Sequence, residues 1–464
     1  MKTLFFIIII SILPQSVHAY DFIYSNIDAN YLQNSANNGY SIASSSDWLF
    51  VGIPGYDLVR PRPLPSIIDA GAVDVYRKDQ SGNWVYFQRI LPSSSAGNYA
   101  KFGSSIDTDD NNVIIGAPGA WDNKGFASLY TFDGYSWNLT LTFKPGTQYI
   151  QDNFGFSVAI DGNCVAIGTP GKDKWDSVNQ INYSNFGEVK NYLLVNGSYT
   201  SLGTKSFTNF SVGNGQLGFS VDVFDAHSEW TPGCRIIAGA PYAKDENGYT
   251  RGAHIGYLIK DNGIIYDEAT ATFGFSNSSE HGYSVSLDCT TVMVLCGLGS
   301  PQYVINNTYC NAAVGEPNDS SFNGIPHGAI TSYSLRPNSY CNPYSYNWNG
   351  GGWLYAYNYI PPAGSRLGHS VSFVNGRGIG GAPGYNDKGS VYLYGHGFDN
   401  HSYVYNIVDN PNQQTNSKFG FSVSVPMDLL PSESFNCVAS SPYYTSPYPS
   451  SYYSVGKSYY IEEI

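Results

Sequence analysis

Apolar and polar residues alternate along short stretches of the chain, and each stretch begins at or next to a glycine. Alternation with a period of two is typical of a β-strand with one buried face. Long stretches with helical spacing do not occur. The alternating runs are GAVDVY at Gly71, GFASLY at Gly125, GEVKNY at Gly187, GAHIGY at Gly252, GAITSY at Gly328, GSVYLY at Gly389 and VGKSYY at Val455.

Two shorter motifs precede each of these predicted strands. The first contains glycine, a variable residue, serine and a β-branched residue: NGYSIA at Asn38, FGSSID at Phe102, FGFSVA at Phe154, LGFSVD at Leu217, HGYSVS at His281, LGHSVS at Leu367 and FGFSVS at Phe419. The second ends near proline: VGIPG at Val51, IGAPG at Ile115, IGTPG at Ile167, AGAPY at Ala238, GGAPG at Gly380, and the degraded forms CGLGSP at Cys296 and SSPYY at Ser440. The chain therefore contains seven repeats, which start near residues 39, 102, 154, 217, 281, 367 and 419.

The composition supports an all-β fold. The chain has 50 Gly, 25 Pro and 40 Tyr, with only 13% charged residues. This mixture is typical of many short strands joined by tight turns.

The registered motifs resemble the FG-GAP repeat of integrin α-subunits. The resemblance implies a seven-bladed β-propeller in which each blade is a four-stranded antiparallel sheet. Repeats of this length with four strand signals each favour the same architecture independently. The seventh repeat reaches only its third strand at Ile464, so we expect residues 20–38, which begin YDFIYSNID, to supply the last strand and close the ring. Residues 20–464 would then form a single propeller domain.

The first nineteen residues are typical of a secretory signal peptide. Lys2 precedes an apolar run from Leu4 to Leu13, and small residues follow at Val17 and Ala19. Neither a spanning segment nor an anchor signal follows, so we expect a secreted, extracellular protein without membrane insertion. The net charge of -13 argues against nucleic acid as a partner.

The acidic stretch DTDDNN lies between the first two strands of the second repeat, where the resemblance would place a calcium loop. A calcium loop needs six to eight converging oxygens around a glycine turn. Asp107, Asp109 and Asp110 lack both that glycine and a final acidic residue. We therefore favour a simple hairpin turn over a calcium site, and expect no cofactor, with calcium as the open alternative.

Seven cysteines and eight glycosylation sequons suit an exported chain. Cys164, Cys234 and Cys437 begin second strands, where we expect small buried apolar residues. In the fifth repeat we expect the disulfide pairs Cys296–Cys310 and Cys289–Cys341, since each pair would share one end of the blade. The sequons are at Asn138, Asn182, Asn196, Asn209, Asn277, Asn306, Asn318 and Asn400.

Catalysis is not the function that we predict. His281 and His369 are the best candidates for an axial hydrolase site, but neither has an evident acidic partner in its own repeat. We instead expect a non-catalytic recognition or adhesion module that binds an extracellular protein or glycan through one propeller face. A structural coat or matrix component is the alternative, and the sequence does not define an oligomeric state.

The resemblance implies that the binding face consists of the loops between second and third strands and between successive blades. The loops that follow Pro54, Pro170 and Pro301 are long and dissimilar, and basic and aromatic residues collect in such loops. The candidate binding residues are Arg60, Arg62, Lys172, Lys174, Trp175, Tyr242 and Lys244.

Overall fold

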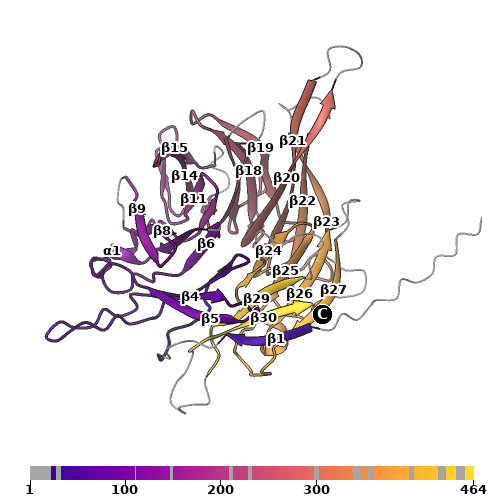
Figure 1. The fold of residues 1–464 in the computed structure, drawn as a ribbon. Coiled ribbons are helices and arrows are strands. Elements are labelled where there is room, and N and C mark those ends of the chain that lie inside the picture. The colour runs from indigo at the N-terminus through magenta and orange to yellow at the C-terminus, as the bar shows by residue number, and fades with distance from the viewer. Residues whose placement is uncertain are drawn as a thin grey trace, which may run out of the picture.

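Seven four-stranded antiparallel sheets form the blades of a ring in the computed structural model (Figure 1). The structure describes residues 22–27, 33–109, 111–146, 150–207, 213–227, 233–296, 303–337, 346–353, 360–396, 402–426, 435–445 and 455–463. The seven-bladed β-propeller predicted from the sequence is confirmed. In that part of the chain, no helix is long and apolar enough to span a membrane.

Each of the first six blades takes four strands in chain order. Blade 1 contains β2 (Ile42–Ser44), β3 (Trp48–Ile53), β4 (Ala72–Lys78) and β5 (Trp84–Ile90); blade 2 contains β6 (Ser105–Asp109), β7 (Asn112–Ala117), β8 (Phe126–Phe132) and β9 (Trp137–Phe143). Blade 3 contains β10 (Val158–Asp161), β11 (Cys164–Thr169), β14 (Glu188–Val195) and β15 (Ser198–Lys205); blade 4 contains β16 (Ser220–Asp225), β17 (Gly233–Ala240), β18 (Ala253–Lys260) and β19 (Ile265–Phe273). Blade 5 contains β20 (Ser284–Cys296), β21 (Tyr303–Glu316), β22 (Ala329–Pro337) and β23 (Tyr346–Trp353); blade 6 contains β24 (Ser370–Val374), β25 (Arg377–Ala382), β26 (Ser390–His396) and β27 (Ser402–Asp409).

The last blade joins the two ends of the chain. It contains β28 (Val423–Ser424), β29 (Asn436–Ser441), β30 (Lys457–Glu463) and, as its outermost strand, β1 (Phe22–Ile27). β1 pairs antiparallel with β30, with Phe22 opposite Glu463. The N-terminal strand therefore closes the ring, as the missing strand of the seventh repeat predicts. The predicted signal peptide lies outside the described residues.

The first motif holds neighbouring blades together. In six blades the motif serine donates its hydroxyl to the carbonyl of the motif glycine in the next blade, at 2.8 to 3.0 Å. The second-motif glycine of the same blade packs against that carbonyl. A Cβ atom on Gly116, for example, would lie 2.0 Å from the oxygen of Gly155. The two motifs therefore form one inter-blade contact, which explains why they recur together.

Apolar side chains fill the spaces between blades. The residue before each motif glycine is buried, and in six repeats the third-strand glycine pairs with that residue of the following blade, as Gly71 does with Phe102. In the seventh repeat Gly456 pairs with Asn38 of blade 1. Phe102, Phe154 and Phe419 have no exposed surface. A bridge of this kind therefore joins every pair of neighbouring blades, including blade 7 and blade 1. Apolar clusters between the blades form the core.

Short elements lie in the loops between second and third strands and in those between blades. They are the single turn α1 (Ala120–Asn123), the 3-10 turns η1 (Ser94–Ala96) and η3 (Tyr385–Asp387), and the hairpin of β12 (Lys174–Asp176) with β13 (Ile181–Tyr183).

Blade 5 differs from the sequence prediction. Its second motif is VGEP at residues 314–317, not CGLGSP at Cys296, because Gly315 packs against the carbonyl of Gly368 as the other second-motif glycines do. Cys296 pairs with Tyr303 at the far end of a long hairpin of β20 and β21, which extends beyond the other blades (Figure 1). β22 pairs with β21 only between Cys310 and Glu316, so the rest of the hairpin has two strands.

Both predicted disulfides are wrong. Cys289 is bonded to Cys310, because these residues face each other across β20 and β21 with their Cα atoms 4.0 Å apart. Neither residue therefore pairs with Cys296 or with Cys341, and Cys341 lies outside the described residues. The prediction failed because it placed the second motif eighteen residues too early, at Cys296 instead of Val314.

The cysteines that begin second strands also differ from the prediction in part. Cys164 in blade 3 and Cys234 in blade 4 form a disulfide between neighbouring blades, with Cα atoms 5.7 Å apart. Cys437 is buried and free, as predicted.

Candidate functional site

The two ends of the ring differ in chemistry. We call the end where the second strands stop the Gly-Ala-Pro face; it comprises the loops between second and third strands and the connections between blades. The opposite end, the hairpin face, comprises the turns between first and second strands and between third and fourth strands. Each end opens into a cavity near the axis, of about 330 Å³ toward the hairpin face and about 290 Å³ toward the Gly-Ala-Pro face.

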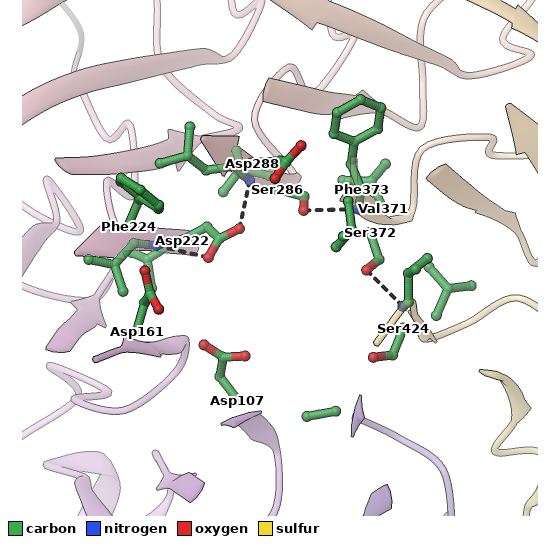
Figure 2. Close-up of a pocket in the computed structure, with 18 of the residues that line it drawn as sticks. Asp107, Asp161, Asp222, Phe224, Ser286, Asp288, Val371, Ser372, Phe373 and Ser424 are labelled. Carbon is green, nitrogen blue, oxygen red and sulfur yellow. Dashed lines mark hydrogen bonds between the residues drawn. The ribbon is translucent and has the colours of Figure 1, made fainter. Parts of the chain in front are cut away.

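Carboxylates from four neighbouring blades line the cavity toward the hairpin face (Figure 2): Asp107, Asp161, Asp222 and Asp288. Asp107 and Asp222 each accept a backbone N–H from the inner strand of the next blade: Asp107 from Ile160 at 2.7 Å, and Asp222 from Leu287 at 2.6 Å. In blades 5 and 6 serine hydroxyls accept the corresponding backbone N–H groups. Ser286 accepts the N–H of Phe373, and Ser372 accepts that of Val425. These axial side chains therefore link inner strands from blade to blade.

The axial carboxylates resist ionisation. Burial raises the pKa of Asp222 to about 7, with a further contribution from the charge of Asp161. Burial also raises the pKa of Asp288 to about 6. The pKa of Asp107 lies well above its usual range because of burial and the charge of Asp222. The cavity is thus less negative at neutral pH than its residue types suggest.

The cavity at the Gly-Ala-Pro face is lined by the variable residue of the first motif. The seven residues at this position are Tyr40, Ser104, Phe156, Phe219, Tyr283, His369 and Phe421, and we call them the aromatic cup. All seven are half-buried. From Tyr40 through Phe421 and onward to Phe156, consecutive ring centroids lie 4.6 to 5.1 Å apart. Six aromatic rings therefore surround the axis.

The cup opens where the second repeat has serine in place of an aromatic residue. Lys101, Asn123 and Asn153 line the cavity beside Ser104. A second cavity of about 300 Å³ shares Tyr40, Lys101 and Ser104 with the first. The two cavities therefore extend from the aromatic cup through this opening toward blade 1.

His369 contributes to the cup as a neutral aromatic ring. Its Nδ1 lies 3.1 Å from the carbonyl of Phe421 and its Nε2 lies 3.4 Å from the hydroxyl of Tyr283, so Nδ1 donates and Nε2 accepts. Burial, followed by the charge of Arg366, lowers the pKa of His369 to about 3. With both nitrogens engaged, His369 is poorly placed to act as a general base.

His281, the other predicted catalytic candidate, is in a closed network. Its Nδ1 lies 2.9 Å from Glu316 and its Nε2 lies 2.7 Å from Nδ1 of His254, and none of the three residues is exposed. Burial alone would raise the pKa of Glu316, but His281 and hydrogen bonds from His281, Thr331 and Ser279 lower it. The expectation that His281 lacks an acidic partner is therefore wrong, because Glu316 belongs to the misplaced second motif.

The predicted basic residues have different environments. The ammonium of Lys172 pairs with Asp152 at 3.0 Å, and that of Lys174 donates to Ser206 and to the carbonyl of Phe207. Burial lowers the pKa of Lys174. Arg60 donates to the carbonyl of Pro65. These three side chains help to hold the loops in place.

The remaining candidate binding residues lie toward solvent on the Gly-Ala-Pro face. Arg62, Trp175 and Lys244 are exposed, and Tyr242 is half-buried with its ring 6.1 Å from that of Phe219. Exposed large apolar residues are frequent in the same loops: Val59, Leu64, Ile68, Tyr99, Trp175, Val178, Ile181, Tyr249, Phe275, Phe322 and Ile325. The face thus combines a central aromatic cavity with an apolar rim.

The stretch that begins at Asp107 forms a hairpin turn. β6 ends at Asp109, which pairs with Asn112 in β7, so only two residues connect the strands. The side chain of Asp109 accepts from that of Asn112, whereas Asp107 faces the axial cavity (Figure 2). Asp110 lies outside the described residues. The connection is therefore a two-residue hairpin turn, and the preference for a turn over a calcium site stays a prediction.

Several sequons are accessible. Asn138, Asn182, Asn196 and Asn277 are exposed, and Asn318 is half-buried. Asn306 lies in the extended hairpin, and Asn209 and Asn400 fall outside the described residues.

The comparison with known families agrees with the motifs. The family described as the FG-GAP repeat matches residues 150–184, which contain β10, β11, β12 and β13. The chain is a seven-bladed β-propeller whose third blade matches the FG-GAP repeat. No curated protein matches it. In this propeller the recurring glycine and serine of the first motif connect the blades, while the residue between them forms the aromatic cup. The sequence already shows an aromatic residue at six of the seven variable positions, a signal that the prediction of basic loop residues missed.

Proposed function

We propose that this FG-GAP propeller is a secreted, non-catalytic recognition module whose partner inserts a side chain or sugar ring into the aromatic cup. The observation that carries the proposal is the arc of six half-buried aromatic residues, open only at Ser104, around a cavity of about 290 Å³. Aromatic residues bury a large area with little conformational entropy and are the usual anchors of interfaces.

The surroundings of the cup support binding of a macromolecule. Exposed apolar side chains such as Trp175, Phe322 and Leu64 lie in loops around it. An apolar anchor pocket with a wider contact rim is the usual anatomy of a protein interface. The two disulfides found among the described residues and the accessible sequons suit an extracellular protein.

Electrostatics would modulate such binding locally. Arg62 and Lys244 are exposed on the Gly-Ala-Pro face of a chain whose net charge is -13. A partner with acidic groups near these residues would associate at a salt-dependent rate. Lys172 and Lys174 would contribute less, since their ammonium groups are held by Asp152 and by the carbonyl of Phe207.

Libraries of peptides and glycans test the proposal. Random peptides displayed on phage and an array of glycans are presented to the intact propeller, and the tightest binder is mapped by amide hydrogen exchange. We expect protection at Tyr40, Phe219 and Phe421 and in the neighbouring loops. Protection confined to the hairpin face, around Asp161 or Asn375, would contradict the proposal, as would turnover of a substrate by the purified protein.

A further inference from the structure

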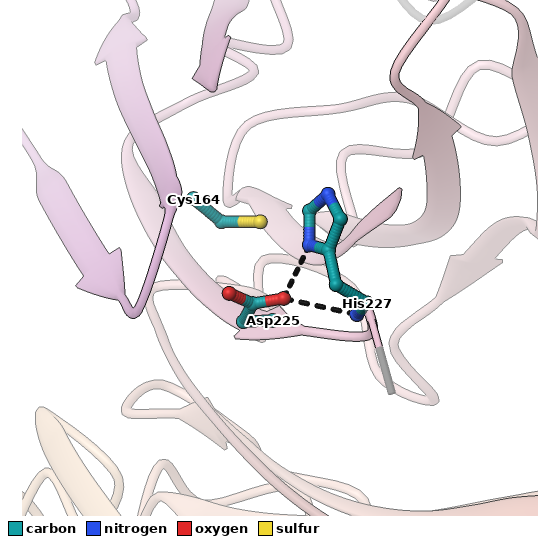
Figure 3. A group of neighbouring side chains, drawn as sticks. All are labelled: Cys164, Asp225 and His227. Atoms are coloured by element: carbon teal, nitrogen blue, oxygen red, sulfur yellow. Dashed lines mark hydrogen bonds and ion pairs between the residues drawn. The ribbon is translucent and has the colours of Figure 1, made fainter. Parts of the chain in front are cut away.

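A cluster of metal-ligating residues lies between blades 3 and 4 on the hairpin face, far along the strands from the aromatic cup. Among the described residues, Cys164, Asp225 and His227 each offer one ligand atom, and these atoms lie within 4.8 Å of one another (Figure 3). Cys164 begins β11, Asp225 ends β16, and His227 lies in the connection to β17. The sulfur of Cys234 adjoins the group, because it is bonded to Cys164.

We propose that Cys164, Cys234, Asp225 and His227 bind a zinc ion when a dithiol has reduced the disulfide. Two thiolates, one imidazole and one carboxylate form a four-ligand set that suits tetrahedral zinc. Sulfur atoms bound to one zinc ion lie about 3.8 Å apart, from a Zn–S distance of about 2.3 Å. The cysteine Cα atoms, 5.7 Å apart on facing strands, leave the sulfurs within reach of a common ion.

His227 is oriented as a zinc ligand requires. Its Nδ1 faces Asp225, while its Nε2 lies 2.9 Å from the carboxylate of Asp261. Histidines that bind metals usually donate their other N–H to a carboxylate, which fixes the ring and strengthens the ligand. Asp261 supplies that contact from the turn after β18, so the imidazole could bind zinc through Nδ1 without rotating.

The backbone would hold the ligands in place after reduction. The second carboxylate oxygen of Asp225 accepts from the amide of Asn163 at 2.9 Å, and the amide of Asp225 donates to Asp161 at 2.7 Å. The hydroxyl of Ser157 also donates a hydrogen bond to the carbonyl of Gly218 across the same pair of blades. These contacts connect blades 3 and 4 without the disulfide.

The site is accessible from solvent. The side chain of His227 is 25% exposed and that of Asp225 is 17% exposed, whereas both cysteines are buried beneath them. A zinc ion could therefore reach the buried sulfurs past the histidine.

The exchange is balanced in atoms and electrons. The dithiol gives two electrons to the Cys164–Cys234 bond and becomes a disulfide, and both cysteines become thiols. Zinc then replaces the two thiol protons and any proton shared between His227 and Asp225, which are released to solvent. The inter-blade link is thus covalent under oxidising conditions and metal-based under reducing ones.

Cobalt titration of the full-length protein tests the proposal, because Co²⁺ reports thiolate ligands by its charge-transfer absorption. After reduction with a phosphine that does not bind metals, we expect one Co²⁺ per chain with thiolate and tetrahedral bands, displaced by one equivalent of zinc. The oxidised protein should lack these bands. The conservative variant Asp261→Asn should lower zinc affinity roughly 10- to 100-fold, as expected for loss of a carboxylate that orients a ligand.

Other cysteines provide the control. The double variant Cys289→Ser, Cys310→Ser should retain the cobalt bands, whereas His227→Asn should bind cobalt at least about tenfold more weakly. Circular dichroism of each reduced variant verifies that the propeller is folded. Absence of thiolate bands in the folded, reduced wild type would overturn the proposal, and so would bands that are unchanged by His227→Asn.

Discussion

Asp222 should destabilise the propeller at neutral and higher pH, so the substitution Asp222→Asn should stabilise it. The side chain lies in the axial cavity, where it accepts the amides of Val223 and Leu287. Burial, with the charge of Asp161, nevertheless raises its pKa from 3.8 to about 7. The neutral form is therefore preferred in the folded protein, and asparagine has the same shape without the charge.

The magnitude follows from the pKa shift. Because the pKa of Asp222 is raised on folding, its contribution to stability is fully present below pH 3.8 and is lost as the pH rises through about 7. At about 1.4 kcal/mol for each pKa unit, the full loss is about 4 kcal/mol. The cavity opens toward solvent, which screens the charge, and the single side-chain oxygen of asparagine replaces two carboxylate oxygens that each accept one amide. We therefore expect Asp222→Asn to raise the free energy of unfolding at pH 8 by about 2 kcal/mol.

Equilibrium unfolding in urea between pH 4 and pH 8 provides the assay. The difference between Asp222→Asn and wild type should be largest at pH 8 and should shrink toward zero at pH 4. Asp133→Asn is the matched control: its carboxylate accepts the amides of Tyr135 and Ser136, which lower its pKa, so this variant should not be stabilised. A loss of stability in Asp222→Asn at pH 8, or a difference that does not depend on pH, would refute the reasoning.

Three further predictions concern the core and the ring. Gly116→Ala should destabilise the fold by about 1 to 3 kcal/mol, since the added Cβ would lie 2.0 Å from the carbonyl oxygen of Gly155, whereas Gly146→Ala, with open space around it, should be neutral in the same thermal unfolding experiment. Deletion of β1 should expose the edge of β30 and lower the unfolding temperature of the whole domain, and an unchanged temperature in calorimetry would contradict ring closure. Burial, reinforced by His281, holds the pKa of His254 well below 6.5, so protonation of the unfolded chain should reduce stability by about 2 kcal/mol between pH 7 and pH 5. His254→Phe should remove that part of the pH dependence. If urea unfolding shows the same loss of stability between pH 7 and pH 5 in the variant and in the wild type, the role assigned to His254 is wrong.

The fold could be predicted from the sequence because its motifs report inter-blade contacts directly. In six blades a glycine meets a carbonyl of the next blade and a serine donates to it, so the two motifs recur together along the chain. The order of the motifs also revealed the missing last strand. The turn at Asp109 was predictable for a similar local reason, since Asx residues and short connections suit a tight hairpin.

The fifth blade was not predictable in the same way. Its β20–β21 hairpin extends well past the sheet, so a chance GLGSP sequence after Cys296 lay closer to the expected spacing than the real motif at Gly315. That shift produced the wrong disulfides and hid the contact between Glu316 and His281. The Cys164–Cys234 bond joins different repeats, and only the packing of blades 3 and 4 brings those residues together.

The candidate site was predictable in its location but not in its residues. The loops after Pro54 and Pro170 do lie on the face with the aromatic cup, yet Lys172 and Lys174 are occupied by internal partners. Charge in a loop does not reveal whether a side chain faces solvent or an acidic neighbour. The cup depends on a ring of seven equivalent positions, which becomes visible only when the repeats are compared at the residue between glycine and serine.

Loss of affinity on opening the aromatic cup tests the central proposal most directly. The peptide or glycan selected on the wild-type propeller is titrated against the double variant Phe219→Ala, Tyr283→Ala and against Tyr135→Ala, which removes an exposed tyrosine from the hairpin face. Truncation of two central aromatic anchors should weaken binding at least about tenfold, while Tyr135→Ala should leave the Kd unchanged. Equal affinity of a folded cup variant and the wild type would contradict the proposal that the Gly-Ala-Pro face of this propeller binds its partner through the aromatic cup.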